Sequence, residues 1–402
     1  MKKPHVLLCS GWQMVNIGDI AHTPAGLALL EQYLPDADIT VWEYKPLSPE
    51  TRRMLAQRFP AVKIVGGSVA PDADTASNAE LDAAIRSADF LLHGSGPATL
   101  AWSHAEGFHR LTGRPFGVYG VTYGLYGIPE RETLSRAEFV YFRDEVSLRA
   151  AQSDGVHPPI MEFAPDVAFA FDLRGDAKAA AFLAANDLET GNFLCCIPRL
   201  RYTPFWDIPE HNAPFDPVKH ERNEAMKEGD LRPLVEAIIR VVRESTMKVL
   251  ICAEDATQVA LGKECLFDKL PADVQKNVVW RDTFWLPDEA LSVYAASAGV
   301  FGCEMHSPIM CIGNGIPAVV CRWAEQSSKG TMWKTIGLSD WLFDLDTEGE
   351  SLRVPEAVLA LAQNPGEARE KANRARHVVQ MRHGETFAVV RQAVFAAHQA
   401  RQ

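Results

Sequence analysis

Residues 300–321 read VFGCEMHSPIMCIGNGIPAVVC, and this stretch decides the fold. Both of its ends are short apolar runs of the kind that form buried strands. Ser307-Pro308 is typical of a helix start, because Ser is a good N-cap and the missing N–H of Pro costs nothing in the first turn. Asn314-Gly315 is typical of a helix end. The stretch therefore predicts a strand, a short helix and a second strand, the repeating unit of parallel α/β sheets.

The same pattern extends along the whole chain. Apolar runs alternate with segments in which apolar residues recur at helical spacing. Because the runs are apolar along their whole length, we expect parallel strands that are covered on both faces. The predicted strands cover residues 5–10, 39–44, 61–67, 89–94, 115–121, 138–144, 192–198, 248–254, 277–282, 299–304, 318–322 and 342–346.

This alternation predicts two doubly wound α/β domains of comparable size. They cover residues 1–188 and 189–364, and a helical segment follows over 365–402. Ligands bind such sheets at the carboxyl ends of the strands, so we expect the two domains to face a shared central cleft. Residues 201–230 are rich in prolines, aromatic and charged residues without a clear period. We expect them to form a long loop that faces the cleft.

The composition excludes several classes of function. The formal net charge of −12 over 402 residues argues against nonspecific binding to nucleic acid or anionic lipid, which needs a basic surface. The eight cysteines include no CxxC pair, so neither a zinc site nor a disulfide framework is predicted. The apolar run over residues 5–9 is too short for an export signal. We therefore expect a reduced, cytoplasmic protein.

Glu304 and His306 are the candidate catalytic residues. Both lie in the predicted turn from strand to helix, at the edge of the sheet where ligands bind. Histidine titrates near neutral pH, so one imidazole can serve as both acid and base. The competing interpretation is structural: His306 would bond a neighbouring backbone group, and Glu304 would pair with an arginine.

Basic residues end or follow other predicted strands at the same edge: Arg143, Arg199, Arg201 and Lys329. A guanidinium there could hold a phosphate or a carboxylate through two hydrogen bonds. Arg143 is equally well placed to pair with Asp144 or Asp166, and the other three are also consistent with solvated surface positions. The sequence alone leaves these alternatives open.

Two turns rich in small residues follow strands of the first domain. One contains Asn16, Gly18 and Asp19, and the other contains Ser95 and Gly96. A glycine in such a turn lets the backbone approach a ligand closely, although both sequences also form ordinary turns. Neither turn is the GxGxxG dinucleotide fingerprint.

Taken together and in this order, these segments resemble the polysaccharide pyruvyl transferase family. The matching pieces are NIGD (16–19), HGSGP (93–97), GRPFGVYGV (113–121), FVYFRDEVSLR (139–149), PDVAF (165–169), CCIPR (195–199), residues 300–320 and Lys329. The resemblance implies a GT-B-like fold of two Rossmann-like domains facing a central cleft. It also implies transfer of the enolpyruvyl unit of phosphoenolpyruvate onto a sugar of a cell-surface polysaccharide or its precursor, which forms a ketal.

The resemblance implies roles for individual residues. His306 would be catalytic, and no metal or cofactor is expected. Glu304 is a catalytic candidate from its place beside His306, where it could orient His306 or accept hydrogen bonds from the hydroxyls of the acceptor. The first domain would bind the acceptor glycan, and the second would bind the donor. The implied donor-binding residues are Arg143, Arg199, Arg201, Ser307 and Lys329, and the implied acceptor-binding residues are Asn16, Gly18, Asp19, Ser95 and Gly96. A lipid-linked acceptor would bring the protein to the periphery of a membrane.

Glu304 departs from the family pattern. The family commonly has Arg-x-His where this chain has Glu304-Met305-His306. Two other functions therefore stay open. One is a GT-B nucleotide-sugar glycosyltransferase, because residues 315–326 resemble the Gly-x-Pro segment that follows the donor site in such enzymes. Many of these enzymes have a second carboxylate eight residues after the first. Here Ile312 stands eight residues after Glu304, which argues against this alternative. The other is a noncatalytic glycan-binding protein, because fold alone does not determine function.

Overall fold

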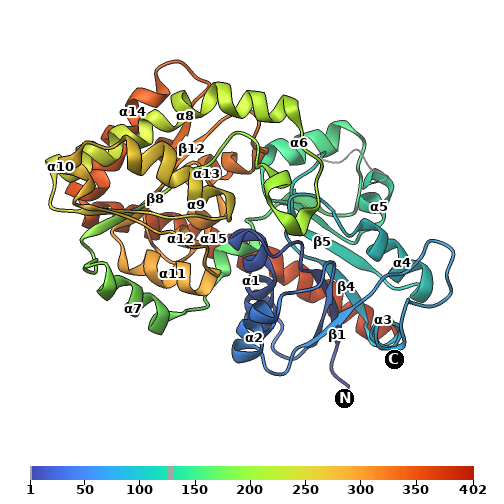
Figure 1. The fold of residues 1–402 in the computed structure, drawn as a ribbon. Helices are drawn as coiled ribbons and strands as arrows, with labels where there is room; N and C mark the ends of the chain where they lie inside the picture. Colours follow the sequence, from blue (N-terminus) through green and yellow to red (C-terminus); the bar gives the residue numbers. More distant parts are fainter. Residues whose placement is uncertain (1, 125–129) are drawn as a thin grey trace. The chain divides into compact units, whose positions relative to one another are not determined.

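The computed structural model describes residues 2–124 and 130–402, which form two compact units (Figure 1). The first unit comprises Met1–Met14, Asp19–Phe171 and Val379–Gln402. The second comprises Val15–Gly18 and Asp172–Val378. The chain therefore enters the second unit twice: briefly after the first strand, and again for most of its second half.

The first unit is built on a parallel sheet of seven strands in the order β3-β2-β1-β4-β5-β6-β7. In the register of the central strands, Leu8 is opposite both Val41 and Leu92. The strands are β1 (His5–Ser10), β2 (Asp38–Glu43), β3 (Lys63–Gly66), β4 (Phe90–His93), β5 (Phe116–Val121), β6 (Val140–Phe142) and β7 (Met161–Phe163). Six were predicted. The edge strand β7 was missed because it is not fully buried and so lacks an apolar run.

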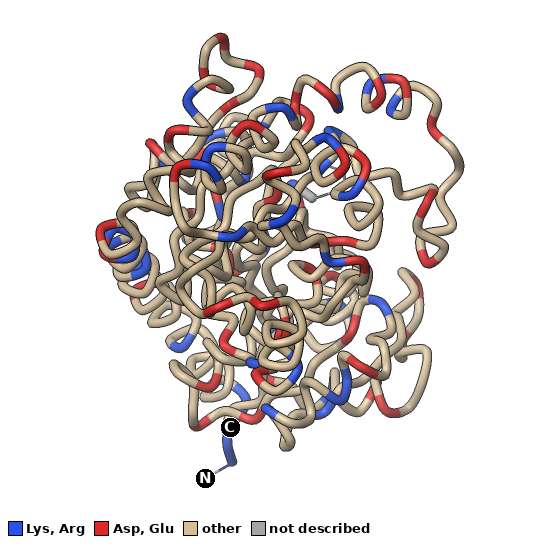
Figure 2. The backbone as a smooth tube through the Cα atoms, turned by 60° about the vertical axis from the view of Figure 1, so that its left-hand side comes forward, with Lys and Arg blue, Asp and Glu red and all other residues tan. Residues whose placement is uncertain are grey.

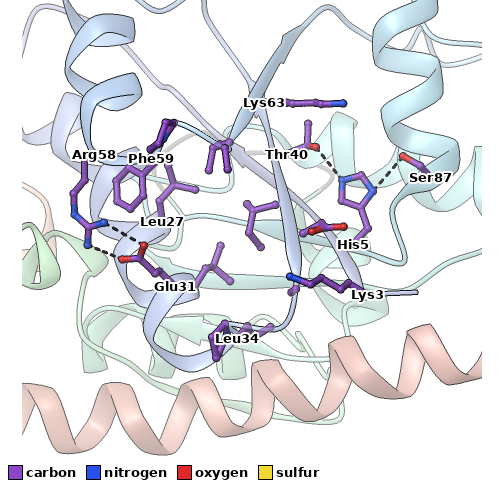
Figure 3. A pocket seen from close by; sticks show the side chains of 18 of the residues that line it. Lys3, His5, Leu27, Glu31, Leu34, Thr40, Arg58, Phe59, Lys63 and Ser87 are labelled. Atoms are coloured by element: carbon purple, nitrogen blue, oxygen red, sulfur yellow. Dashed lines mark hydrogen bonds and ion pairs between the residues drawn. The ribbon is translucent and has the colours of Figure 1, made fainter. Parts of the chain in front are cut away.

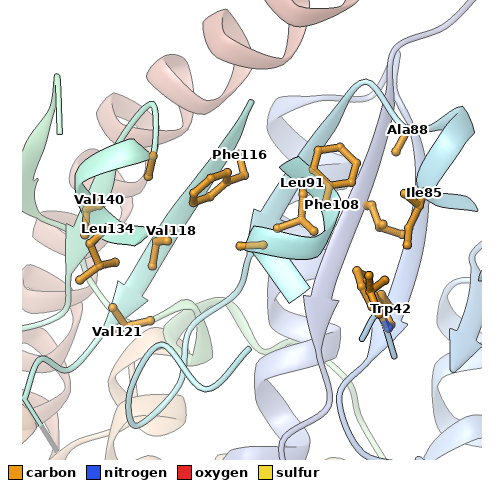
Figure 4. Packing of buried hydrophobic residues seen from close by; sticks show 14 of the residues in the cluster. Trp42, Ile85, Ala88, Leu91, Phe108, Phe116, Val118, Val121, Leu134 and Val140 are labelled. Atoms are coloured by element: carbon orange, nitrogen blue, oxygen red, sulfur yellow. The ribbon is translucent and has the colours of Figure 1, made fainter. Parts of the chain in front are cut away.

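Helices cover both faces of this sheet. They are α1 (Ile17–Tyr33), α2 (Pro49–Arg58), α3 (Ala79–Ser87), α4 (Trp102–Thr112), α5 (Glu130–Arg136) and α6 (Glu145–Ser153). On one face, side chains of α3 to α6 such as Ile85 and Phe108 pack against Leu91 and Val118 of the strands (Figure 4). On the other face, Tyr33 of α1 contacts Phe387, with ring centroids 5.4 Å apart. This double cover explains why the strands are apolar along their whole length.

The second unit contains a parallel sheet of six strands in the order β10-β9-β8-β11-β12-β13. All six were predicted. They are β8 (Phe193–Ile197), β9 (Lys248–Ile251), β10 (Val278–Trp280), β11 (Gly299–Gly302), β12 (Ala318–Arg322) and β13 (Leu342–Asp344). The helices are α7 (Asp176–Ala185), α8 (Pro217–Glu244), α9 (Thr257–Leu261), α10 (Ala272–Gln275), α11 (Pro287–Ala296), α12 (His306–Gly313), α13 (Met332–Thr335) and α14 (Glu350–Gln363).

The division of the chain differs from the domain limits expected at 188 and 364. Helix α7 belongs to the second unit, because Ser292 of α11 donates to Asp176 at 2.7 Å and the N–H of Gly175 donates to the carbonyl of Asp288 at 2.9 Å. The final helix α15 (Pro365–Ala400) is counted with the second unit up to Val378 and with the first unit from Val379.

Helix α8 corrects the prediction of a long loop over residues 201–230. The helix begins at Pro217, so half of that segment is helical. Asp216 caps it by accepting the N–H of Lys219 at 3.1 Å, and Pro217 occupies the first helical position. The irregular part is limited to residues 201–216 and includes two short 3₁₀ turns, Phe205–Asp207 and Pro209–His211.

Charged residues of both signs are mixed along the backbone (Figure 2). Across residues 2–124 and 130–402, no helix is long and apolar enough to cross a membrane.

Candidate active site at the carboxyl edge of the second sheet

The candidate site lies where the strand order of the second sheet reverses. Strand β8 is flanked by β9 on one side and β11 on the other. The crevice beyond the carboxyl ends of such strands is where doubly wound sheets bind ligands. The loops that leave these three strands carry Arg199, Glu254 and Glu304.

Gly302 ends β11 in a conformation that other residues rarely adopt, with φ at 152°. A Cβ there would lie 2.1 Å from the carbonyl oxygen of Ile197 in β8. The glycine thus lets the chain leave the sheet directly beside β8. Two residues later the side chain of Glu304 meets Arg199, which follows β8, at 3.2 Å.

His306 lies between a carboxylate and an ammonium group. Its Nδ1 is 3.3 Å from Glu254 Oε1. The Nζ of Lys329 is 3.4 Å from each ring nitrogen. The carboxylate favours a proton on Nδ1, so Nε2 keeps its lone pair in the neutral imidazole. This arrangement suits a group that exchanges a proton through Nε2.

Glu254 also anchors helix α12. Its Oε2 accepts the backbone N–H of Ser307 at 2.7 Å, so this carboxylate takes the position of an anion at the start of the helix. The helix therefore begins at His306, and Ser307 is not its N-cap as predicted. The Ser307 hydroxyl is bonded to Tyr294 at 3.2 Å. Both polar groups of Ser307 thus have partners inside the protein.

Residues 16–18 are part of this site. The sequence predicted a turn here, but helix α1 already begins at Ile17. The N–H of Ile17 donates to the carbonyl of Glu254 at 3.0 Å, and Asn16 forms an isolated bridge with Asp255. Gly18 touches the imidazole so closely that a Cβ would lie 2.0 Å from Cγ of His306. The structure therefore groups Asn16 and Gly18 with the catalytic candidate His306 rather than with the sheet that precedes them.

The carboxyl group of Glu304 is bonded to Arg199 and Gln258. It is buried, and it accepts hydrogen bonds from Arg199 at 3.2 Å and from Gln258 at 2.6 Å. Burial raises the pKa of Glu304 to about 7, while the charge of Arg199 opposes the rise and the nearby Glu254 adds to it. The pairing of Glu304 with an arginine is thus the structural alternative foreseen from the sequence.

Gln258 connects the three acidic residues of the site. Its Oε1 accepts the N–H of Glu254 at 2.7 Å, which fixes the orientation of the amide. Its Nε2 then donates to Glu304 and, at 3.0 Å, to Asp255. Burial and the charge of Glu304 raise the pKa of Asp255 to about 6. Two carboxyl groups of the cluster therefore change charge near neutral pH.

The two arginines after β8 differ in how fully their guanidinium groups are paired with other residues. Arg201 is buried and pairs with Asp230, Glu325 and Asp346 at 2.7–2.8 Å. Among the described residues, the guanidinium of Arg199 makes two long hydrogen bonds, of 3.2 Å to Glu304 and 3.4 Å to Thr203. Its Nε has no hydrogen-bond partner among the described residues. Arg199 is therefore suited to receive an anion, whereas Arg201 is held in a structural network.

Arg143 belongs to the first unit and pairs there with Asp166 at 2.7 Å, one of the alternatives left open above. Asp166 also lies 3.2 Å from Nε2 of His22, whose Nδ1 is 3.8 Å from Asp19. Arg143, His22 and Asp166 are fully buried. The candidates Asp19 and Arg143 are thus connected by His22, which the sequence analysis did not single out.

Ser95 and Gly96 have structural partners in the first unit. The Ser95 hydroxyl donates to the carbonyl of Tyr119 at 3.3 Å and accepts the N–H of Val167 at 3.2 Å. A Cβ on Gly96 would lie 2.9 Å from the indole nitrogen of Trp12. These contacts are those of a tight connection between strand and helix, and acceptor binding by these residues stays a prediction.

A cavity of about 580 Å³ lies at the opposite, amino edge of the first sheet (Figure 3). Lys3, Lys63 and Arg58 line it together with Leu27 and His5. His5 is bonded to Thr40 and Ser87, and Arg58 is paired with Glu31. The cavity contains none of the candidate site residues.

Glu254, Asp255 and Gln258 are the site residues that were not predicted from the sequence. Glu254 closely follows β9, just as Glu304 closely follows β11, so the same rule that selected Glu304 would have selected it. Gln258 carries no comparable signal, because its role depends on which loops meet at this edge.

Residues 16–325 match the family described as polysaccharide pyruvyl transferase. No curated protein matches the chain.

Solved structures share the fold. Anabaena HepE in complex with UDP and glucose has a TM-score of 0.56 at 11% identity, covering 97% of this chain and all of that one. Medicago truncatula UGT71G1 with UDP-glucose has a TM-score of 0.54 at 10% identity, covering 98% of each chain. S. aureus MnaA with UDP has a TM-score of 0.54 at 11% identity, covering 92% and 90%. The predicted GT-B-like class with two Rossmann-like units is confirmed.

Proposed function

Because the chain belongs to the polysaccharide pyruvyl transferase family and is a transferase, we propose that it moves the enolpyruvyl unit of phosphoenolpyruvate onto a sugar. The product is a cyclic ketal on a cell-surface polysaccharide or its precursor. The observation that carries the proposal is the placement of His306 between Glu254 and Lys329 at the switch point of the second sheet.

The reaction needs one group that both gives and takes protons. A sugar hydroxyl adds to C2 of phosphoenolpyruvate while C3 gains a proton and becomes a methyl group. The second hydroxyl then attacks C2, the bond from C2 to the phosphate oxygen breaks, and inorganic phosphate leaves. Of the two hydroxyl protons lost, one replaces the proton given to C3 and the other leaves with phosphate. His306 exchanges these protons, and Glu254 stabilises the imidazolium.

The donor carries a carboxylate and a phosphate, so it needs cations. Arg199 and Lys329 supply them from the loops after β8 and β12. The long hydrogen bonds of Arg199, and its Nε without a partner in the described part of the chain, support this role. The proposed reaction uses no metal and no further cofactor, and phosphate release is expected to persist in the presence of a chelator.

The test is phosphate release from phosphoenolpyruvate with candidate glycosides. We expect His306→Ala to lower the turnover about 10²–10⁴-fold, the usual contribution of general acid–base catalysis. His377→Ala is the matched control, because His377 is an exposed histidine of the second unit. Unchanged turnover in His306→Ala would exclude the catalytic assignment.

Ligand binding separates this proposal from nucleotide-sugar transfer, the chemistry suggested by neighbours crystallised with UDP or UDP-glucose. We expect phosphoenolpyruvate to raise the melting temperature and UDP to leave it unchanged. The reverse result would favour a glycosyltransferase, and no shift with either ligand would favour a glycan-binding protein.

A further inference from the structure

Glu304 occupies the place of an anion beside Arg199. Its Oε2 accepts from Arg199 at 3.2 Å and also lies 3.3 Å from the backbone nitrogen of Met305. Its Oε1 is held by Gln258 at 2.6 Å. Such a set of donors around one buried carboxylate resembles the set that a substrate carboxylate or phosphate requires.

The charges of the cluster are unbalanced. The carboxyl groups of Glu254, Asp255 and Glu304 face two cations, Arg199 and Lys329, with His306 between Glu254 and Lys329. An incoming dianion would add further negative charge to a buried cluster that already has an excess of carboxyl groups. Such an addition is costly unless one resident charge is removed.

We propose that Glu304 is a resident counter-ion for Arg199 and that anion binding transfers this arginine from Glu304 to the donor as Glu304 takes up a proton. This inference rests on the proposed function for the identity of the donor. Protonation leaves the bond from Gln258 to Glu304 Oε1 intact while it removes the charge that competes for Arg199. The raised pKa of Glu304, about 7, makes this exchange accessible near neutral pH.

The exchange predicts a pH dependence with a definite sign. Below pH 7 Glu304 is already neutral, so an anion binds without proton uptake. Above pH 7 each anion must bring a proton, and the affinity falls by up to about tenfold per pH unit. Phosphoenolpyruvate itself titrates, since a phosphate monoester has a second pKa near 6. Sulfate is therefore the better probe, because it stays a dianion over this range.

The experiment is calorimetric titration of sulfate at pH 8 in two buffers that differ in ionisation enthalpy. We expect uptake of about one proton per sulfate in the wild type. In Glu304→Gln we expect no uptake, and an affinity that changes less than about twofold between pH 6 and pH 8. Glu348→Gln is the control, because Glu348 is exposed in the same unit. Arg199→Gln should abolish sulfate binding at this site.

Proton uptake that persists in Glu304→Gln would overturn the inference, as would a failure of the wild type to bind sulfate. Phosphate release from phosphoenolpyruvate is measured separately. Turnover that requires His306, without proton uptake that requires Glu304, leaves the proposed function standing and removes the counter-ion. Proton uptake that requires Glu304, without turnover that requires His306, supports the counter-ion role of Glu304 and argues against phosphoenolpyruvate as the donor.

Discussion

At the scale of single residues, the site depends on one close approach. Gly18 has no room for a methyl group, since a Cβ would lie 2.0–2.2 Å from Cγ, Nδ1 and Cβ of His306. The sequence marked Gly18 as a glycine in a turn, and marked His306 by its place after a strand. Their contact joins segments nearly three hundred residues apart, so no local pattern could reveal it.

We expect Gly18→Ala to move the imidazole and to lower turnover by at least about 10²-fold, as misplacement of a catalytic group by an ångström does. The control is Gly26→Ala in the same helix, where a Cβ would lie 3.7 Å from its nearest neighbour, Leu8. That change should keep activity and add up to about 1 kcal/mol of stability. Equal activity of the two variants would show that the approach of Gly18 is unimportant.

At the scale of elements, local signals placed the strands well and the loops poorly. Apolar runs predicted the twelve strands of the sequence analysis, because a strand buried on both faces must be apolar throughout. The start of α8 was missed although Asp216-Pro217 is a regular cap, because the polar surface of its first turns hides the helical period. The partners of Arg201 were also unpredictable, since Asp230, Glu325 and Asp346 lie on three separate segments.

The two arginines after β8 should respond differently to truncation. Arg201→Ala leaves the buried carboxylate of Asp230 without its partner and should lower the free energy of unfolding by about 3–5 kcal/mol. Arg199→Ala should destabilise less, because the carboxyl of Glu304 can take up a proton, and it should weaken anion binding instead. Urea denaturation with sulfate titration separates the effects. Similar stability losses would show that Arg199 is equally structural.

At the scale of the molecule, the units differ in their expected response to pH. In the first unit, burial lowers the pKa values of His93, His104 and His383 to about 4. The contribution of these histidines to the free energy of unfolding is complete above their pKa in the unfolded chain, near 6.5. It is lost as the pH falls toward 4, at up to about 1.4 kcal/mol per pH unit for each histidine. In the second unit, Glu304 and Asp255 have raised pKa values of about 7 and about 6. Their contribution is present near pH 4 and is lost as the pH rises through 6–7.

Acidification from pH 6.5 to pH 5 should therefore weaken the first unit and strengthen the second. Hydrogen exchange, corrected for intrinsic rates, measures the local stability of each unit at each pH. Peptides from β4 and β5 report on the first unit, and peptides from β9 and β11 report on the second. His93→Gln should reduce the slope of the opening free energy of the first unit against pH. The exposed His157→Gln should leave that slope unchanged. Parallel slopes in the two units would contradict the prediction.

The sequence by itself determined the fold class and the family, because buried strands, helix caps and glycine turns are local features that each segment carries. It also selected His306, since the end of a strand is visible in the chain. Only the tertiary structure decided the partners: Glu254 and Lys329 around His306, Glu304 against Arg199, and Arg201 in a separate network. The reason is that strand order sets which loops meet, and strand order depends on packing across the whole sheet.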